Sequence, residues 1–557
     1  MKRFFRLTLL VIVFTAMVNA TQAQYRFGGA MMDHDGMMGS DMFTLSQVNF
    51  GFGTARSMAM AGAFTSLGGD VASMGINPAG LGMYRSNDIS FSPLMGFQNA
   101  ENSAMSWGDN NQSRFAVSNL GVVLNLYENS KSKLVSVNFG FGYNRIADFN
   151  YRYGFSSESG ASSAPYRSIA DAFSLMMNQS GLFPETNDSA LPYDFRDAYY
   201  WGGMLAYNNY LLDVGVDDEG IPFYTTADRL GVNAGVGHTA NMQSRGSIGE
   251  YDISFGLNYN NKLYLGFTWG IQSVNWKRQI YYGEDYLYPE GSVPVYSDGV
   301  ALSEPVRWMD YNQAVLVNGT GMNAKIGLIY RPVEALRLGV AVHTPTFYAL
   351  ERSYQAYMAT ATATATDIKL QESTTPELED FGENTWDFWS PTRLMFGASY
   401  AFGRFAVVSV DYERDWYNGM RVKKVPAGFD LTAEQYRQEF RDNYKGSNTL
   451  RIGAEVKPLP SFALRAGYGV ASGALRNDKS WYYNAPQIYK TTCLSAGAGF
   501  AVGATTIDLS YQHINNKQTE YMLFYAMDNN GVFDTASPTY RTDLNRNYFT
   551  LTIGYRF

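Results

Sequence analysis

The residues of this chain alternate between apolar and small or polar types with a period of two along most of its length, and this pattern limits the possible folds more than any other feature. One segment shows it clearly, because Val135, Val137 and Phe139 are separated by Ser136 and Asn138. Successive side chains of a β-strand point to opposite faces, so a strand of this kind has one apolar and one polar face. A transmembrane barrel needs that arrangement, with apolar side chains toward lipid and polar side chains toward the lumen.

About fourteen segments have this pattern, and short and long connections alternate between them. The segments lie near residues 88–98, 114–127, 133–152, 249–260, 262–276, 319–331, 335–345, 392–402, 404–416, 447–457, 462–474, 490–502, 504–514 and 546–557. The long connections are predicted as external loops and cover about residues 153–248, 277–318, 346–391, 417–446 and 515–545. Because outer-membrane barrels have short periplasmic turns and long external loops, the sequence predicts an all-β fold, a transmembrane antiparallel β-barrel of about 14 strands over residues 87–557. Two short amphipathic helices are expected within the loops, near residues 168–177 and 432–444.

The first residues have the features of a secretory signal peptide. Residues 1–20 contain three basic residues, an apolar run at residues 7–18, and small residues that place the cleavage after Ala20 or Ala23. Removing the three basic residues takes the formal net charge from −8 to −11. A chain this acidic is a poor candidate for binding nucleic acid, so none is expected as a partner.

The final alternating segment indicates the outer membrane of a Gram-negative bacterium. It ends with Tyr555 and Phe557 on the apolar face. A terminal aromatic residue on an alternating strand resembles the signal that the outer-membrane assembly machinery reads. We therefore expect that machinery as a partner during biogenesis, membrane lipid as the surroundings of the barrel, and a monomer as the folded form.

Residues 24–50 are predicted to form a flexible leader that is rich in methionine. Met31, Met32, His34 and Met37 are of the types that bind copper or contact haem. Their spacing is irregular and the leader contains a single histidine, so we expect no metal site and no cofactor.

Residues 51–81 are rich in glycine and other small residues and carry almost no charge. The stretch ends in a short motif that consists of Asn77, Pro78, Ala79, Gly80 and Leu81. Asn-Pro and Ala-Gly pairs also occur in ordinary turns, but here the motif follows a small-residue run and precedes the first strand. We expect residues 51–86 to be a compact plug, or hatch, inside the lumen.

The sequence of this segment resembles the N-terminal hatch of the FadL-like family of outer-membrane transport proteins, which move long-chain fatty acids and other hydrophobic molecules. The residues that match are the small-residue run at 55–69, Asp70, and the motif at 77–81; residues 325–343 and 450–468 are similar to strand-turn-strand segments of the family. The resemblance implies a passive conduit. A hydrophobic molecule would be caught by the external loops, enter a lumen pocket, and leave sideways through a gap in the barrel wall once the plug shifts.

Two pairs of residues are candidates for that mechanism. Gly140 and Gly142 are candidates for a kink at a lateral gate, because glycine weakens strands and marks bulges. The alternative is that small residues face inward there to accommodate the plug. By parity, Lys325 and Arg393 point into the lumen, where a carboxylate head group would need a cation. The alternative is that these cations are paired with lumen acids such as Asp252.

The predicted function is therefore passive uptake of hydrophobic molecules, with long-chain fatty acids as the leading substrate. Haem and aromatic hydrocarbons are alternatives, because the leader is rich in methionine and the loops in tyrosine. A surface adhesin or scaffold with a non-conducting barrel is a further alternative, in which the long second loop would bind a partner. We do not expect an enzyme, because no common catalytic motif occurs and the four histidines, His34, His238, His343 and His513, lie far apart.

Overall fold

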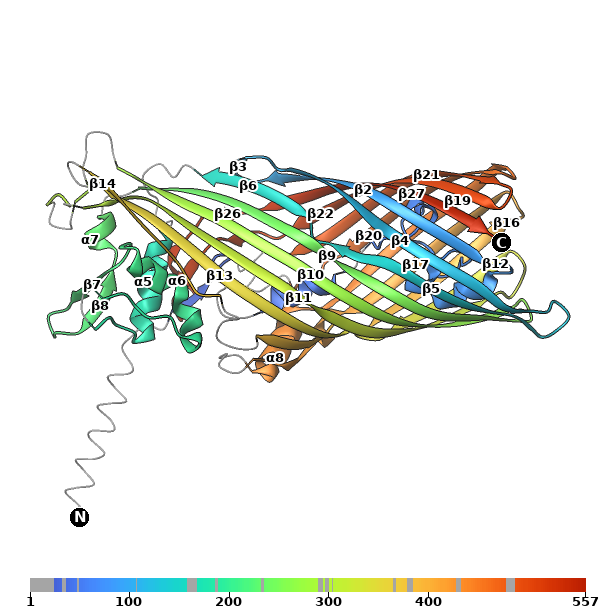
Figure 1. The fold of residues 1–557 in the computed structure, drawn as a ribbon, viewed down its shortest axis with the longest axis horizontal. Coiled ribbons are helices and arrows are strands. Elements are labelled where there is room, and N and C mark those ends of the chain that lie inside the picture. Colours follow the sequence, from blue (N-terminus) through green and yellow to red (C-terminus); the bar gives the residue numbers. More distant parts are fainter. Residues whose placement is uncertain are drawn as a thin grey trace, which may run out of the picture.

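A closed antiparallel β-barrel dominates the computed structural model of the chain (Figure 1). The structure describes residues 25–32, 37–47, 50–106, 108–157, 168–185, 189–231, 235–288, 294–295, 300–302, 304–363, 367–377, 384–426, 432–476 and 486–557. The predicted signal peptide at residues 1–20 and the leader residue His34 lie outside the described residues. No helix among the described residues is long and apolar enough to cross a membrane.

The barrel has fourteen strands, and some of them are divided into two successive segments. In chain order they are β2 (Asp88–Asn102), β4 (Asn111–Glu128), β5 (Leu134–Asp148) with β6 (Tyr151–Ser157), β9 (Gly235–Tyr259), β10 (Leu263–Leu287), β11 (Val306–Tyr330), β12 (Leu336–His343) with β13 (Phe347–Ala363), β15 (Thr385–Trp389) with β16 (Arg393–Phe402), β17 (Ala406–Trp416) with β18 (Arg421–Lys424), β19 (Gly446–Leu459), β20 (Phe462–Ser472), β21 (Ile488–Val502), β22 (Thr505–Gln518) and β27 (Thr542–Arg556). The ladder between β2 and β27 closes the barrel and places Ile89 opposite Tyr555. The predicted fold class is confirmed, and each predicted segment overlaps one of these barrel strands.

The outer face of the barrel carries a belt of exposed apolar side chains. In β5 the outward Phe141 is 50% exposed, whereas the inward Asn138 is fully buried. Along β10 the outward positions are apolar as far as Ile271 and become polar from Ser273 onward. A belt of about ten residues per strand has the height of the hydrocarbon core of an outer membrane, so it is the lipid-facing surface of a transmembrane barrel.

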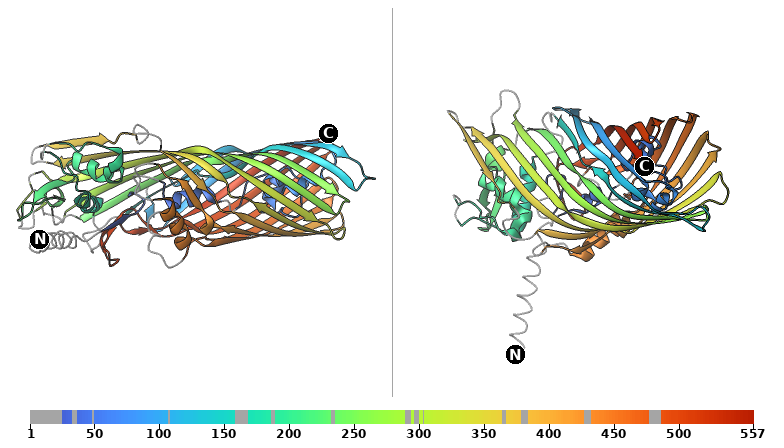
Figure 2. Two further views of the ribbon diagram at one scale, coloured as in Figure 1. Left: turned by 90° about the horizontal axis from the view of Figure 1, so that it is seen from below. Right: turned by 45° about the vertical axis from the view of Figure 1, so that its right-hand side comes forward.

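Three strands run far beyond this belt at the end of the barrel that has the long loops. Strands β9, β10 and β11 each have 25 residues, and the wall that they form projects beyond the rest of the barrel (Figure 2). The predicted loops at 277–318 and 346–391 are therefore too long, because the structure forms strands over much of both ranges. The alternation fades there for a physical reason: outward positions such as Lys277 face water rather than lipid, so both faces can carry polar residues.

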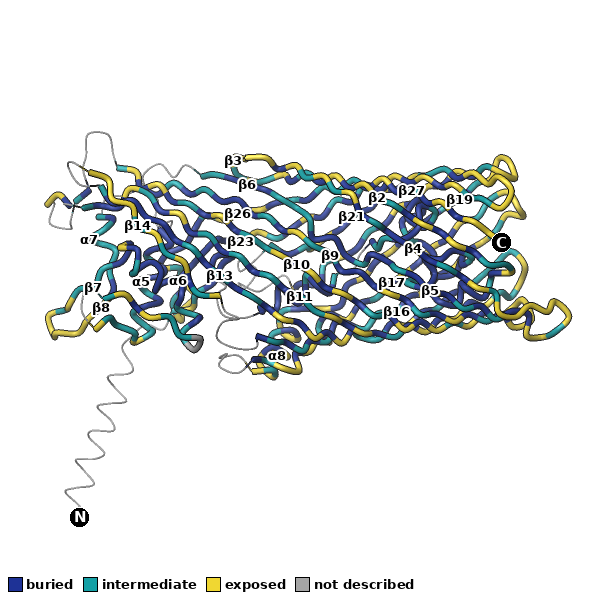
Figure 3. Tube along the Cα trace, in the orientation of Figure 1, coloured by how far each residue is buried: buried dark blue, intermediate teal, exposed yellow. Residues whose placement is uncertain are grey.

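The loop between β6 and β9 packs against this projecting wall. It contains α5 (Ile169–Ser180), η2 (Phe195–Tyr200), α6 (Trp201–Asn208), β7 (Asp213–Val216), β8 (Pro222–Thr225) and α7 (Ala227–Leu230). Phe173 and Trp201 are fully buried in the apolar core of the region. The trace of α5 is coloured mostly as buried in Figure 3. The predicted helix near 168–177 is α5, and the one near 432–444 is α8 (Ala433–Asn443).

The prediction of a flexible leader is wrong for the leader residues that the structure describes. Strand β1 (Arg26–Gly28) pairs with β24 (Tyr525–Met527), and helix α2 (Gly39–Ser46) is almost completely buried. Met31 and Met37 are fully buried in the same core as Phe173. Methionine is apolar and adapts to irregular gaps, so these side chains pack into the apolar core that the projecting loops form.

Candidate functional site

Residues 51–86 lie inside the lumen, where glycines of the wall make room for them (Figure 1). They form α3 (Ala55–Ala59), α4 (Ser73–Ile76) and the 3-10 helix η1 (Pro78–Met83). A Cβ atom added at Gly266 of β10 would collide with the backbone of Pro78 and Ala79, and one at Gly467 of β20 with the backbone of Met60 and Ala61. These contacts come from opposite parts of the wall, so the segment, called the hatch below, fills the barrel from side to side.

Asn77 of the predicted motif joins three segments of the molecule. Its Nδ2 donates to the carbonyl oxygen of Thr65 at 2.6 Å, and it lies 3.3 Å from the carbonyl oxygen of Leu328 in β11 and 3.4 Å from that of Val340 in β12. Its Oδ1 accepts from the amide of Ala79 at 3.1 Å and caps η1. Asparagine is suited to this position, because its short amide both donates and accepts.

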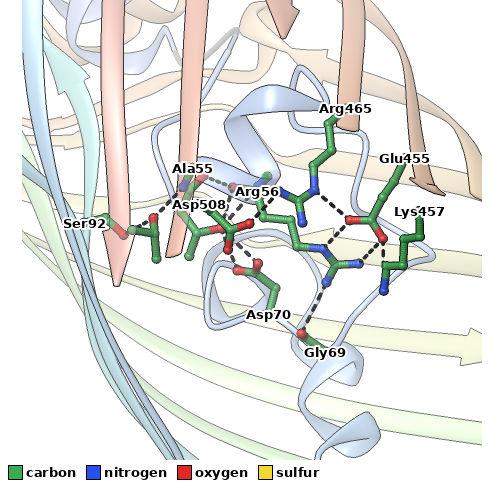
Figure 4. Close-up of polar contacts among 12 residues, drawn as sticks. Ala55, Arg56, Gly69, Asp70, Ser92, Glu455, Lys457, Arg465 and Asp508 are labelled. Atoms are coloured by element: carbon green, nitrogen blue, oxygen red, sulfur yellow. Dashed lines mark hydrogen bonds and ion pairs between the residues drawn. The ribbon is translucent and has the colours of Figure 1, made fainter. Parts of the chain in front are cut away.

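A charged cluster holds the other side of the hatch (Figure 4). Arg56 Nε lies 3.0 Å from Glu455 Oε2 of β19, and Arg465 of β20 links Glu455 to Asp508 of β22 at 2.7 and 2.6 Å. Asp70 accepts from Thr54 Oγ1 at 2.9 Å, so it stabilises the start of α3. The hatch is therefore held by ion pairs and hydrogen bonds, which can break without unfolding the wall.

Three adjoining cavities, which share lining residues, lie between the hatch and the long-loop end. The central cavity, about 100 Å³, is bounded by Gly62 and Ile76 of the hatch and by Tyr348 of the wall. A second cavity, also about 100 Å³, shares Phe52 and Ile146 with the central cavity. We call it the kink cavity because residues 146–149, where β5 ends and the chain bends toward β6, line it. The outer cavity, about 30 Å³, shares Thr44, Tyr151 and Pro486 with the kink cavity. Together they trace an interrupted path from the loops down to the hatch.

Two larger vestibules lie on the opposite side of the hatch, at the end with the short turns. One has a volume of about 640 Å³ and is lined by Arg337, Arg404 and Val407, and the other has about 330 Å³ and is lined by Asp70 and Arg556. Among the described residues, no residue that lines a vestibule also lines one of the three cavities. The hatch therefore separates the lumen into two compartments.

The barrel wall is interrupted beside the kink cavity. Pairing between β4 and β5 ends at Asn119 and Asn144, although β4 begins at Asn111. A register shift between Arg145 and Ala147 follows in the ladder of β5 with β9. Beyond this shift, β6 pairs with β9 and with the short strand β3 (Met105–Ser106), and the backbone amide of Arg152 donates to the inward side chain of Gln98 at 3.2 Å. The third barrel strand, β5 with β6, thus bends inward. Residues 111–117 of β4 keep their ladder with β2, but residues 111–118 have no ladder partner on the side of β5.

Side chains close this gap instead of backbone ladder bonds. Arg145 Nε donates to the carbonyl oxygen of Val117 in β4 at 3.2 Å. Arg114 Nη1 lies 3.2 Å from Asp148 Oδ1 and donates to the carbonyl oxygen of Gly246 at 3.1 Å. Gly246 has a φ of +126°, a conformation that favours glycine, and its carbonyl oxygen also accepts from the backbone amide of Phe149 at 3.1 Å. We call this interruption, between residues 111–118 and 145–148, the wall gap.

Gly140 and Gly142, the candidates for a kink at a lateral gate, do not lie at the interruption of the wall. Both glycines keep an unbroken register with Ser254 and Asp252 of β9. A Cβ atom at Gly140 would meet Met74 and Leu81 of the hatch. Their small size accommodates the hatch, which is the alternative that the sequence left open.

The structure brings the predicted head-group residues Lys325 and Arg393 into the same central cavity. Each is paired with carboxylates, however: Lys325 Nζ contacts Glu250 and lies 3.0 Å from Asp252, and Arg393 Nε lies 3.3 Å from Asp415. Arg451, which also lines this cavity, lies 2.8 Å from Glu413. These three cations are therefore neutralised within the protein.

Arg145 is a buried cation of the same cavity that the sequence interpretation missed. The odd-numbered residues of β5 from Val137 to Tyr143 face lipid, and by the same parity Arg145 would do so too. A charged residue at a lipid-facing position is a signal that the alternation is broken there. Among the described residues, no group of three histidine, cysteine or acidic side chains is placed to hold a metal ion.

No protein-family model matches the chain, and no curated protein matches it. Solved structures of similar shape include a Pseudomonas aeruginosa FadL homologue, with 11% identity and a TM-score of 0.48 over 91% of this chain and 100% of that one. The CymD monoaromatic hydrocarbon channel has 14% identity and a TM-score of 0.45 over 91% of this chain and 98% of that one. The Ralstonia pickettii toluene transporter TbuX has 16% identity and a TM-score of 0.44 over 91% of this chain and 99% of that one.

Proposed function

We propose that this chain is an outer-membrane channel for the passive uptake of hydrophobic molecules. The observation that carries the proposal is the combination of a hatch that divides the lumen with a wall gap that lies on one side of it. The end with the short turns faces the periplasm and the projecting loops face the exterior, as in other outer-membrane barrels. Because the hatch blocks the axial path, a molecule in the kink cavity would leave sideways into the membrane once the side chains that close the wall gap move apart.

The wall gap suits a hydrophobic molecule. Backbone groups inside a membrane must have hydrogen-bond partners, so an unpaired stretch of wall is costly unless other groups satisfy it. Arg145 and Arg114 supply those partners as movable side chains rather than as a fixed strand. An apolar molecule that leaves through the gap passes directly into lipid and avoids the polar vestibules.

Long-chain fatty acids are the leading substrate class in this proposal. The kink cavity combines apolar side chains, including Phe52, Ile146, Ile514 and Leu544, with a similar number of polar ones, so it offers surfaces for both parts of an amphiphile. Its volume is smaller than a fatty acid needs, so binding requires a movement of the hatch or of the inward bend. Aromatic hydrocarbons and haem remain the alternative substrates, and Phe52, Phe149 and Tyr548 offer ring surfaces to them.

One observation favours a second function, adhesion or scaffolding at the cell surface. Exposed apolar side chains gather on the loop elements furthest from the membrane, including Val216 and Ile221 at the tip of the β7–β8 hairpin. Such patches often bind a partner. Deleting residues 214–224 would reduce cell or protein binding under this second function and would leave uptake unchanged.

An uptake measurement with a blocked kink cavity tests the proposal. Ala147 is buried and lines this cavity beside the wall gap, so Ala147→Trp fills it. We expect uptake of radiolabelled oleate into cells to fall at least fivefold. The matched control is Ala398→Trp, which places the same ring on the lipid-facing side of β16. Equal uptake by both variants and the unchanged chain would refute the lateral route.

A further inference from the structure

Arg145 lacks a counter-charge although it is buried. Its side chain belongs to a residue that is 6% exposed, and it lines the central cavity. Arg145 Nε donates to the carbonyl oxygen of Val117, whereas Arg145 Nη1 is buried without a hydrogen-bond partner. In the part of the chain that the structure describes, no carboxylate lies within ion-pair distance of it. A buried guanidinium in this state is destabilising by several kcal/mol unless an anion joins it.

Arg145 differs in this respect from the other cations of the central cavity. Lys325, Arg393 and Arg451 each have a carboxylate partner from another strand. The protein therefore neutralises its structural cations and leaves Arg145 available. The unpaired cation is also the one that lies at the wall gap.

The neighbouring kink cavity is lined by apolar and polar side chains, with one arginine and one carboxylate among them. Arg546 lines it, and its Nε has no hydrogen-bond partner in the structure. The one carboxylate among the described lining residues is Asp148, which already lies 3.2 Å from Arg114. Ile146 belongs to both cavities, so a molecule with its charged end at Arg145 can place its tail against Phe52 and Ile514.

We propose that Arg145 binds the head group of an amphiphile that carries a single carboxylate, with its tail in the kink cavity. A guanidinium donates two parallel hydrogen bonds to a carboxylate, and such charge-assisted pairs are strong when water is excluded. This inference names the substrate class of the proposed channel and rests on that function for its transport role. The head group would replace the missing counter-ion of Arg145 and would compete with Val117 for its donors, so binding loosens the closure of the wall gap.

Binding to the purified full-length chain tests this site without a transport assay. The probes are laurate and 1-dodecanol, which have the same chain length but differ in head-group charge, and native mass spectrometry of the detergent-solubilised protein measures their affinities. We expect Arg145→Gln to weaken laurate binding by about 10- to 100-fold, the range for one charge-assisted hydrogen-bond pair, and to change dodecanol binding less than twofold. Arg145→Lys keeps the charge and should recover part of the affinity.

The control is Arg421→Gln, which neutralises an exposed arginine of β18 and should bind both probes as the unchanged chain does. Equal laurate affinity for Arg145→Gln and the unchanged chain would overturn the proposal, as would equal affinity of the unchanged chain for both probes. If Arg145 proves necessary for laurate binding but cells take up no hydrophobic molecule, the binding site stands and the proposed transport function fails. Normal binding of dodecanol by a variant shows that the variant is folded.

Discussion

Arg56 of the hatch and Glu455 of the barrel wall form an ion pair, with 3.0 Å between Nε and Oε2. Glu455 is shared with Arg465, which in turn contacts Asp508 (Figure 4). The pair joins two parts of the chain that are almost four hundred residues apart. Together with the buried apolar side chains of Met58, Met74 and Leu81, it helps to hold this small segment in place inside the barrel.

Removing this pair should loosen the hatch. In Arg56→Gln, Glu455 keeps Arg465 but loses its contact with the hatch, so we expect hydrogen exchange of residues 55–70 to become at least tenfold faster. Leak of a small polar solute through the reconstituted barrel should rise as well. Mass spectrometry of exchange and a liposome-swelling assay measure these effects, and Arg421→Gln is the control. Unchanged protection in Arg56→Gln would show that the pair does not hold the hatch.

A larger residue on the inner wall should displace the hatch without breaking the barrel. Gly467→Val places a side chain against the backbone of Met60 and Ala61, and overpacking of this kind typically costs 1–3 kcal/mol. We expect a folded barrel with raised polar leak. Gly51→Ala is the comparison, because no atom lies within 4 Å of a Cβ at Gly51. A tight barrel in Gly467→Val would contradict the close fit described above.

Helix α8 should respond to pH through Glu439. Burial raises the pKa of this carboxyl group from its usual range to about 7, and the group lies over Gly39 at the start of α2. Because the folded state holds the proton more tightly than the unfolded state, the contact is most stable at acidic pH and weakens as the pH rises toward and through 7.

The measurement is hydrogen exchange of residues 433–443 at pH 5 and pH 8, corrected for the intrinsic rates. Protection should be lower at pH 8, and Glu439→Gln should remove most of the difference. A difference that persists in Glu439→Gln would assign the effect to another group.

The lipid-facing half of the fold could be predicted from the sequence, and the parts outside the membrane could not. Residues such as Phe141 and Asn138 must alternate because lipid lies on one side and the lumen on the other. Strands β9 to β11 lose that constraint beyond the belt, where residues such as Lys277 meet water. Met31 and Met37 gave no periodic signal, because their burial depends on loops that are distant in the sequence.

The candidate site was predictable in part for a related reason. Asn77 could be recognised from its motif, and parity correctly placed Lys325 and Arg393 in the lumen. Their carboxylate partners lie on other strands, so pairing required the register of the barrel. The glycines suggested a kink at Gly140 and Gly142, whereas the register shift follows Arg145. The sequence signal of this shift is the charge of Arg145 at a position that parity assigns to lipid.

The location of a bound ligand tests the central claim most directly. A crystal structure of the full-length chain soaked with 12-bromododecanoate would show the bromine by its anomalous scattering. The account predicts the bromine in the kink cavity, among Phe52, Ile146 and Ile514, with the carboxylate at Arg145. Bromine below the hatch, in the vestibule beside Arg337 and Val407, would mean that ligands pass through the hatch rather than through the wall, and would contradict the lateral route.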